Sequence, residues 1–301
     1  MNWNQLQYVI TIAMEKNITR AAKKLYISQP SLTLSIKALE KELGVILFER
    51  NHGNISLTYG GKLFYEWALS TLHSNRQLTL KLNDISNQNR HLIRLGISPH
   101  RSNIILPDVL ERFYREYPAC ELHVTEKPTY ILKKMLENDS IDLIIDVAHP
   151  DTVNYQSDLL INESIMIAIP KTFISGYSSI ESSIDLKQLL ELPFIMLSED
   201  QILGSMSRKI CESANFYPDI RMITSNIETA LMLASRQIGI TFVPEIFSVQ
   251  KRFSSEIQYA SIRDFHIQRQ ICLVYHKNLY QCKQLSALIR LFREMIPNMY
   301  Q

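Results

Sequence analysis

The feature that most constrains this chain is a run of about thirty residues with no helix breaker. Residues 62–90 contain neither proline nor glycine. One series of positions within the run repeats every three or four residues: Phe64, Ala68, Thr71, Asn75, Leu78, Leu82 and Ile85. This spacing predicts a long helix with a contact seam along one side. A helix of that length needs a packing partner, which is either the rest of the chain or a second copy.

The residues before this helix carry the signals of three shorter helices. The first fifteen residues have one amphipathic stripe, and Asn17 or Thr19 can cap a second helix. Ser28 can cap a third helix, which has Pro30 in its first turn and ends at Gly44. Three closely spaced helices of this kind are typical of a helix-turn-helix domain.

A hairpin signal follows the third helix. Two short extended segments, residues 47–50 and 54–58, are joined by Asn51, His52 and Gly53. Three helices and a hairpin predict a winged helix-turn-helix over residues 1–58, followed by a linker helix over residues 59–90.

From residue 91 onward, short apolar runs alternate with helical patterns. Strands are expected at residues 92–97, 121–124, 141–147, 165–169, 194–197 and 240–243. Helices are expected at residues 104–117, 130–136, 206–214, 226–236 and 281–295. Strand–helix alternation predicts parallel sheets with right-handed crossovers. The expected α/β domain covers residues 91–301. Its two subdomains are subdomain I, about 91–162 and 268–301, and subdomain II, about 163–267.

Several enzyme classes lack their entry motifs in this sequence. The eight glycines cannot be assembled into G-x-G-x-x-G, a Walker-type phosphate loop or G-x-S-x-G, and the eight histidines include no H-E-x-x-H. We therefore expect no enzymatic activity, no cofactor and no metal site. The four cysteines are widely spaced, which indicates thiols in a reducing compartment. No signal peptide or membrane span is apparent, so a cytoplasmic protein is expected.

Charge is unevenly distributed along the chain. Residues 1–62 hold eight Lys and Arg against four Asp and Glu, whereas the remaining residues hold 24 basic and 26 acidic side chains. A small basic head on a slightly acidic body favours a polyanionic partner for the head, although an excess of four charges can also arise by chance.

Six ordered motifs in the head resemble the LysR-type transcriptional regulators. They are residues 6–9 (LQYV), 18–25 (ITRAAKKL), 27–32 (ISQPSL), 39–44 (LEKELG), 47–50 (LFER) and 57–61 (LTYGG). Weaker similarity continues at residues 93–98 (IRLGIS), 141–145 (IDLII) and 237–244 (QIGITFVP). The resemblance implies a periplasmic-binding-protein-like effector domain and a linker helix that pairs two heads. It also implies promoter DNA, a small-molecule effector, RNA polymerase and further copies of the chain, as a homodimer or homotetramer, as partners.

The resemblance further implies which residues contact DNA. The expected residues are Thr19, Arg20, Ser28, Gln29, Pro30, Ser31, Thr33, Leu34, Lys37, Arg50 and His52. Helical periodicity agrees for the third helix, because a core-facing Leu32 and Ile36 put Leu34 and Lys37 on the opposite side. The alternative is an ordinary solvated helix face. Family members usually have arginine at position 34, and Leu34 is either a plain exposed leucine or an apolar contact for a thymine methyl group.

By resemblance, the effector binds between the two α/β subdomains, near strand ends and helix N-termini. The matching residues are Ser98, His100, Arg101, Thr129, Asp146 and Ser198. Arg101 can bind a carboxylate bidentately, but it can equally be a solvated loop residue. Ser98 and Thr129 can instead act as helix caps, and Asp146 can form a local salt bridge.

Three functions are compatible with at least part of this sequence. A ligand-responsive DNA-binding regulator accounts for both the head and the α/β body. A solute-binding protein accounts only for the body and requires an export signal. An enzyme acting in the α/β domain has no recognisable nucleophile–base motif or phosphate loop.

Overall fold

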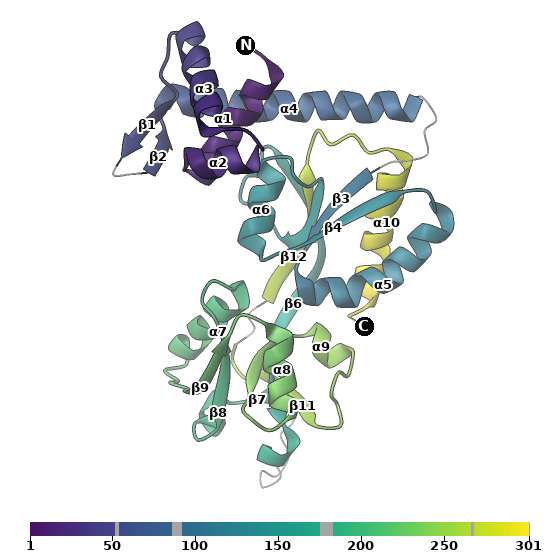
Figure 1. The fold of residues 1–301 in the computed structure, drawn as a ribbon. Coiled ribbons are helices and arrows are strands. Elements are labelled where there is room, and N and C mark those ends of the chain that lie inside the picture. The colour runs from purple at the N-terminus through teal and green to yellow at the C-terminus, as the bar shows by residue number, and fades with distance from the viewer. Residues whose placement is uncertain (52–53, 86–91, 175–182, 266–267, 301) are drawn as a thin grey trace. The chain divides into compact units, whose positions relative to one another are not determined.

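A computed structural model describes residues 1–51, 54–85, 92–174, 183–265 and 268–300 of the chain (Figure 1). By contact density the chain divides into two units. The first unit contains residues 1–88 and the short segment 137–140, and the second contains residues 89–136 and 141–301.

The N-terminal unit begins with the predicted winged helix-turn-helix. Its elements are α1 (Trp3–Glu15), α2 (Ile18–Lys24), α3 (Gln29–Leu43), β1 (Phe48–Asn51) and β2 (Asn54–Leu57). The two strands are antiparallel, with Phe48 opposite Leu57. The core of the head is made of Val9, Ile12, Ala21, Ala22, Leu32, Ile36, Leu39 and Leu47. The structure confirms the fold that the sequence predicts for residues 1–58.

Local hydrogen bonds explain where these helices begin and end. Asn17 caps α2 by accepting from the backbone N–H of Arg20, and Ser28 caps α3 by accepting from the backbone N–H of Ser31. The α3 helix ends at Gly44, as expected. The Glu40 carboxylate of α3 accepts from the backbone N–H of Leu47 and thereby fixes the start of the wing.

The long helix α4 (Tyr59–Ile85) begins directly after the wing. Thr58 Oγ1 accepts from the backbone N–H of Gly61 at 2.9 Å and donates to the Ile46 carbonyl at 2.6 Å. A Cβ at position 61 would lie 2.0 Å from the Leu47 carbonyl oxygen, so only glycine allows α4 to start this close to the wing.

The two halves of α4 differ in their packing. In the first half, Phe64 and Ala68 pack against Leu6 and Ile10 of α1. In the second half, Leu78 and Leu82 leave 54% and 55% of their surface exposed. The chain's own α1 therefore supplies the partner for one half of the predicted seam, and exposed leucines remain on the other half.

The second unit is a mixed α/β domain. Its strands are β3 (Leu92–Ile97), β4 (Glu121–Glu126), β5 (Leu143–Val147), β6 (Tyr155–Pro170), β7 (Ser183–Ile184), β8 (Pro193–Leu197), β9 (Asp219–Thr224), β10 (Thr241–Pro244), β11 (Ile257–Ile262) and β12 (Gln268–His276). Its α-helices are α5 (Pro99–Glu116), α6 (Thr129–Glu137), α7 (Ile202–Ser213), α8 (Ile227–Ser235), α9 (Ile246–Val249) and α10 (Lys283–Asn298). Two 3₁₀ turns occupy Lys171–Ile174 and Leu186–Leu189.

The sheet order is β4-β3-β5-β12-β6-β11-β7, with β10 also paired to β6 and with β8 and β9 forming a separate parallel pair. The sequence pattern predicts parallel sheets, and this prediction is wrong for the middle of the sheet. The β6 strand pairs antiparallel with β12 through its first part and antiparallel with β10 and β11 through its last part. One long strand thus connects two groups of strands, and β12 returns beside it, which makes the middle of the sheet antiparallel (Figure 1).

Candidate DNA-binding surface and effector pocket

The start of α3 presents short polar side chains to solvent. Ser28, Gln29, Pro30 and Ser31 are all exposed. The Ser28 and Ser31 hydroxyl oxygens lie 2.8 Å apart, and Thr19 Oγ1 of α2 donates to Gln29 Oε1 at 2.9 Å. These contacts join the beginnings of α2 and α3 into one polar surface at a helix N-terminus, where a phosphate group is favoured.

The outward side of α3 continues with Leu34 and Lys37. The opposite, core-facing side consists of Leu32, Ile36 and Leu39. Leu34 is 68% exposed and Lys37 is exposed, while Thr33 between the two sides is half-buried. The periodicity of the sequence therefore predicted correctly which side of α3 is exposed.

Three other residues expected to contact DNA lie outside α3. Arg20 is exposed on α2, and its Nη2 donates to the Glu15 carbonyl at 2.6 Å. Arg50 belongs to strand β1, but its side chain and the whole of His52 lie outside the described residues.

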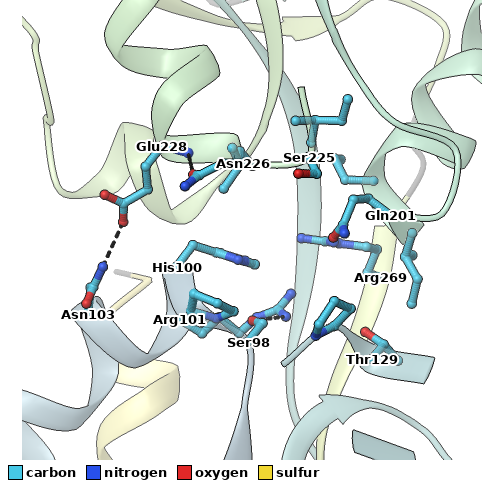
Figure 2. A pocket seen from close by; sticks show the side chains of 16 residues that line it. Ser98, His100, Arg101, Asn103, Thr129, Gln201, Ser225, Asn226, Glu228 and Arg269 are labelled. Atoms are coloured by element: carbon cyan, nitrogen blue, oxygen red, sulfur yellow. Dashed lines mark hydrogen bonds between the residues drawn. The ribbon is translucent and has the colours of Figure 1, made fainter. Parts of the chain in front are cut away.

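The second unit contains a pocket of about 390 Å³ at the point where four helices begin (Figure 2). The N-terminal residues of α5, α6, α7 and α8 and the residues just before them line it, together with Leu197 of β8 and Arg269 of β12. The lining residues are Ser98, Pro99, His100, Arg101, Asn103, Pro128, Thr129, Leu197, Gln201, Ile202, Leu203, Ser225, Asn226, Ile227, Glu228 and Arg269. Its volume falls within the range of small-molecule sites.

A buried ion cluster forms part of this pocket. Arg101 and Arg269 are only 3% and 6% exposed, and both guanidinium groups contact the same carboxylate oxygen of the fully buried Glu163. Glu163 and Arg269 are cross-strand neighbours on β6 and β12. Tyr300 donates from its hydroxyl group to the other oxygen of Glu163 at 2.6 Å. Glu163 and Tyr300, which do not line the pocket, thus hold the two lining arginines in place.

Burial and charge set the protonation of this cluster. Burial by itself raises the pKa of Glu163, but the positive charges of Arg269 and Arg101 outweigh it and lower the pKa to about 2. Burial lowers the pKa of His100 well below its usual range, and the neighbouring Arg101 charge adds to that effect. The His100 ring lies against Phe247, with 6.2 Å between ring centroids. Glu163 is therefore ionised and His100 neutral near pH 7.

The hydroxyl groups of Ser98 and Thr129 contact side chains in this region. Ser98 occupies the N-cap position of α5 without making a side-chain cap, and its hydroxyl oxygen accepts from Arg101 Nη1 at 3.2 Å. Thr129 is the first residue of α6, and its hydroxyl group donates to Asp146 Oδ1 at 2.9 Å. The sequence allowed both Ser98 and Thr129 to act as simple helix caps. In the structure, each hydroxyl group instead bonds to another side chain.

The expected loop at residues 98–101 is in fact the start of a helix. The sequence pattern placed the helix start at residue 104, whereas α5 begins at Pro99. Arg101 is accordingly a buried helical residue and not a solvated loop residue.

Two of the six residues expected to contact the effector do not line the pocket. Asp146 is 1% exposed, and it accepts hydrogen bonds from Thr129 and from the backbone N–H of Val147. No salt bridge of Asp146 is present among the described residues, contrary to the local ion pair considered for it. Ser198 follows the lining residue Leu197. Its carbonyl oxygen lies so close to α7 that a Cβ on Gly204 would be 2.1 Å away.

Sequence reasoning missed much of the pocket lining. Arg269 lies in strand β12, which the sequence pattern does not reveal. Asn226 and Glu228 lie at the start of a helix that the pattern does predict, but no effector-binding residue is expected there. A usable signal was Glu163, a lone carboxylate between the apolar residues Ile161 and Ile165. A charge in such a strand requires a buried partner.

A hydrogen bond crosses one side of the pocket between α5 and α8. Asn103 Nδ2 donates to Glu228 Oε1 at 3.0 Å (Figure 2). Arg252 also contacts Glu228 with two N–H groups, at 3.2 and 3.1 Å. The Glu228 carboxylate is therefore already neutralised by a protein cation.

Metal clusters and membrane-spanning helices are both absent from the described part of the chain. No group of three or more His, Cys, Asp or Glu residues suited to a metal ion occurs within it. None of its helices is both long enough and apolar enough to cross a membrane. The four cysteines are buried thiols, as the sequence indicated.

Comparison with known proteins places both units in one family. Residues 3–62 match the family described as "Bacterial regulatory helix-turn-helix protein, lysR family", and residues 86–297 match "LysR substrate binding domain". The transcriptional regulator YcgK of Bacillus subtilis is 27% identical over 315 residues, covering all of this chain and 96% of YcgK.

Solved structures show the same fold over nearly the whole chain. A full-length OxyR variant from Pseudomonas aeruginosa is 22% identical, with a TM-score of 0.68, and the match covers 98% of this chain and 95% of that one. Full-length CbnR in complex with its target DNA is 23% identical, with a TM-score of 0.53, covering 98% of this chain and all of CbnR.

A winged helix-turn-helix joined to an α/β ligand-binding domain defines a DNA-binding transcriptional regulator. The chain belongs to the LysR family of transcriptional regulators, with a helix-turn-helix DNA-binding domain and an effector-binding domain. Proteins of this family bind DNA and form oligomers.

Proposed function

We propose that this regulator contacts DNA through the start and outward side of α3 and responds to a small molecule bound in the α5–α8 pocket. The observation that carries the proposal is the pocket itself. Four helix N-termini and two buried arginines surround about 390 Å³ of space in the domain that its family uses for effectors. Besides DNA, the proposed partners are a small-molecule effector and RNA polymerase. We propose a cytoplasmic location, where the protein can meet all of these partners.

The DNA-contacting residues divide by chemistry. Thr19, Arg20, Ser28 and Ser31 offer donors suited to phosphate oxygens near the start of α3, and Gln29, Thr33 and Leu34 are placed to meet base edges. Lys37 provides a phosphate contact one turn further along. Pro30 fixes the first turn of the helix, and Arg50 and His52 of the wing are proposed to approach the minor groove.

Replacing Lys37 with alanine tests this surface. Each phosphate that a protein neutralises contributes about −0.9 to the slope of log affinity against log salt. We expect Lys37→Ala to flatten that slope by about one unit and to weaken binding to all DNA sequences alike, as measured by fluorescence anisotropy with the DNA upstream of the gene. Lys209→Ala removes another exposed lysine, from the other unit, and should leave the slope unchanged. An unaltered slope for Lys37→Ala would remove Lys37 from the DNA interface.

Leu34 should determine one base preference. A leucine can offer only apolar contact, whose best partner in the major groove is the thymine methyl group, so we expect an A·T pair at that position of the half-site. Leu34→Arg should shift the preference toward G·C, because arginine can bind guanine bidentately at a gain of about 1–3 kcal/mol. Binding selection on randomised half-sites with both proteins measures the shift. Identical recovered motifs would mean that Leu34 contacts no base.

For the effector site, the proposed contacts are Ser98, His100, Arg101 and Thr129. Arg101 and Ser98 are hydrogen-bonded to each other at the start of α5, so a ligand that engages one affects the other. Asp146 would act through Thr129, to which it is bonded, and Ser198 through its neighbours in the lining. We further propose the division into a head (1–58), a linker helix (59–90) and an effector domain (91–301) with two subdomains.

A further inference from the structure

The pocket contains more hydrogen-bond donors than its own residues satisfy. Arg101 and Arg269 both line it, both are more than nine-tenths buried, and the Nε of each has no hydrogen-bond partner among the described residues. The α5 and α7 helices also begin there without a side-chain cap, at Ser98 and Gln201. The backbone N–H groups of their first turns are therefore available to a ligand. Unused donors of this kind call for a ligand rich in acceptors.

The charges around the pocket set how much negative charge it can accept. The two guanidinium groups are opposed by the buried carboxylates of Glu163 and Asp146, while His100 is neutral. The fixed charges thus cancel, and Glu228 is neutralised separately by Arg252. Two uncapped helix N-termini add about half a positive charge each. Together they supply a positive charge of about one. A ligand with one negative charge balances it, whereas a ligand with two negative charges does not.

Another part of the lining is apolar. Leu197, Ile202, Leu203 and Ile227 contribute side chains to the pocket, and Pro99 and Pro128 add to them. A volume of about 390 Å³ suits a small organic molecule with a hydrocarbon part.

We propose that the effector is a small monocarboxylic acid. Its carboxylate accepts hydrogen bonds from the guanidinium N–H groups that Glu163 leaves unused and from the first turns of α5 and α7. Its hydrocarbon part lies against Leu197, Ile202 and Ile227. A carboxylate fits better than a phosphate monoester because it carries one charge, and its two oxygens match the geometry of a guanidinium group. This inference rests on the proposed function of the pocket as the effector site.

The test uses three series of unbranched compounds with three to eight carbons: monocarboxylates, the corresponding amides and the corresponding α,ω-dicarboxylates. Members of one chain length differ in charge, at −1, 0 and −2, and hardly in size. Binding to the full-length protein is measured by isothermal titration calorimetry. We expect the best monocarboxylate to bind about 10- to 100-fold more tightly than its amide, as charge-assisted hydrogen bonds require. An amide or a dicarboxylate that binds as tightly, or the absence of binding by every monocarboxylate, would overturn the proposal.

A variant at the start of α7 tests the same idea without touching the buried ion cluster. Gln201→Asp places a carboxylate at an N-cap position, where aspartate is favoured, so the variant should fold normally. Its charge opposes the bound carboxylate, and we expect monocarboxylate affinity to fall about tenfold while amide affinity is unchanged. Gln250→Asp makes the same change at an exposed position outside the pocket and should alter neither affinity. Equal loss of both ligands in Gln201→Asp would contradict the proposal.

A DNA-binding assay on the same preparations distinguishes failure of the monocarboxylate proposal from failure of the proposed regulator function. Normal DNA binding that responds to some other class of compound would overturn the monocarboxylate while leaving the proposed regulator intact. Failure to bind DNA under any condition would count against the proposed function itself.

Discussion

Glu163→Gln should lower the melting temperature of the effector domain by roughly 10 °C. The substitution keeps the size of the side chain but leaves the guanidinium groups of Arg101 and Arg269 buried without their shared counter-charge. Breaking a buried ion cluster in this way costs about 3–5 kcal/mol, and each kcal/mol shifts the melting temperature of a domain this size by about 2–4 °C. Circular dichroism of the full-length protein at pH 7 measures the shift.

The matched control is Glu116→Gln. Glu116 pairs with Arg290 at 3.7 Å, but both side chains are more than half exposed, and exposed pairs contribute at most about 1 kcal/mol. If Glu163→Gln were no more destabilising than Glu116→Gln, the buried cluster would not stabilise the domain.

Acid provides an independent signature of the same carboxylate. The pKa of Glu163 is lowered to about 2 in the folded protein, from an ordinary value of about 4.3. A carboxyl group with a depressed pKa stabilises the fold above its unfolded-state pKa, and that contribution is lost as the pH falls through the folded-state value. The difference in stability between the native protein and Glu163→Gln should therefore be full above about pH 4.5 and shrink toward pH 2.

The head could be predicted from the sequence because its determinants are local. Asn17, Ser28 and Gly44 mark helix ends through contacts within a few residues, and the two strands of the wing pair across a short turn. The exposure of Leu34 and Lys37 followed from helical periodicity alone. Such features need no knowledge of distant parts of the chain.

The apolar pattern predicts the start of α5 five residues too late, although the sequence contains a better signal for it. Four polar residues, His100 to Asn103, interrupt the apolar pattern that was used to find the helix. The better signal was Ser98 followed by Pro99, because serine is favoured at the N-cap and proline at the first helical position. Recognising it would have placed Arg101 in the first turn of α5, close to the pocket.

The remainder of the pocket depends on contacts between residues far apart in sequence. Arg269 meets Glu163 because β12 and β6 are antiparallel neighbours, a pairing separated by 106 positions. The polar pattern at the start of β12 resembles an exposed segment, and only the tertiary structure shows that Arg269 within it is buried. Sequence alone therefore identified the side of the pocket formed by α5 and α6, but not the contributions of β12 and α8.

The second large effect is expected at the linker helix. Leu78→Asp combined with Leu82→Asp should convert the assembled protein into single chains of about 35 kDa in analytical ultracentrifugation. Both leucines are more than half exposed, so the substitutions should not disturb the packing of α4 on α1, which uses Phe64 and Ala68. If this part of α4 packs against a second copy, however, the two aspartates place like charges in an apolar seam between the copies, which destabilises the interface.

DNA affinity should fall together with assembly. Two joined heads bind two half-sites about one helical turn apart, and linking two binding modules raises apparent affinity about 10²- to 10⁴-fold over one head alone. We expect the double variant to lose that advantage on a two-site fragment while binding a single half-site as well as the native protein does. Ser70→Asp with Thr79→Asp adds the same charge at exposed positions off the stripe and should leave the oligomer intact. If the leucine variant still sedimented as a dimer or tetramer, the exposed half of α4 would not be the essential interface, and the contacts between copies would have to lie in the effector domain.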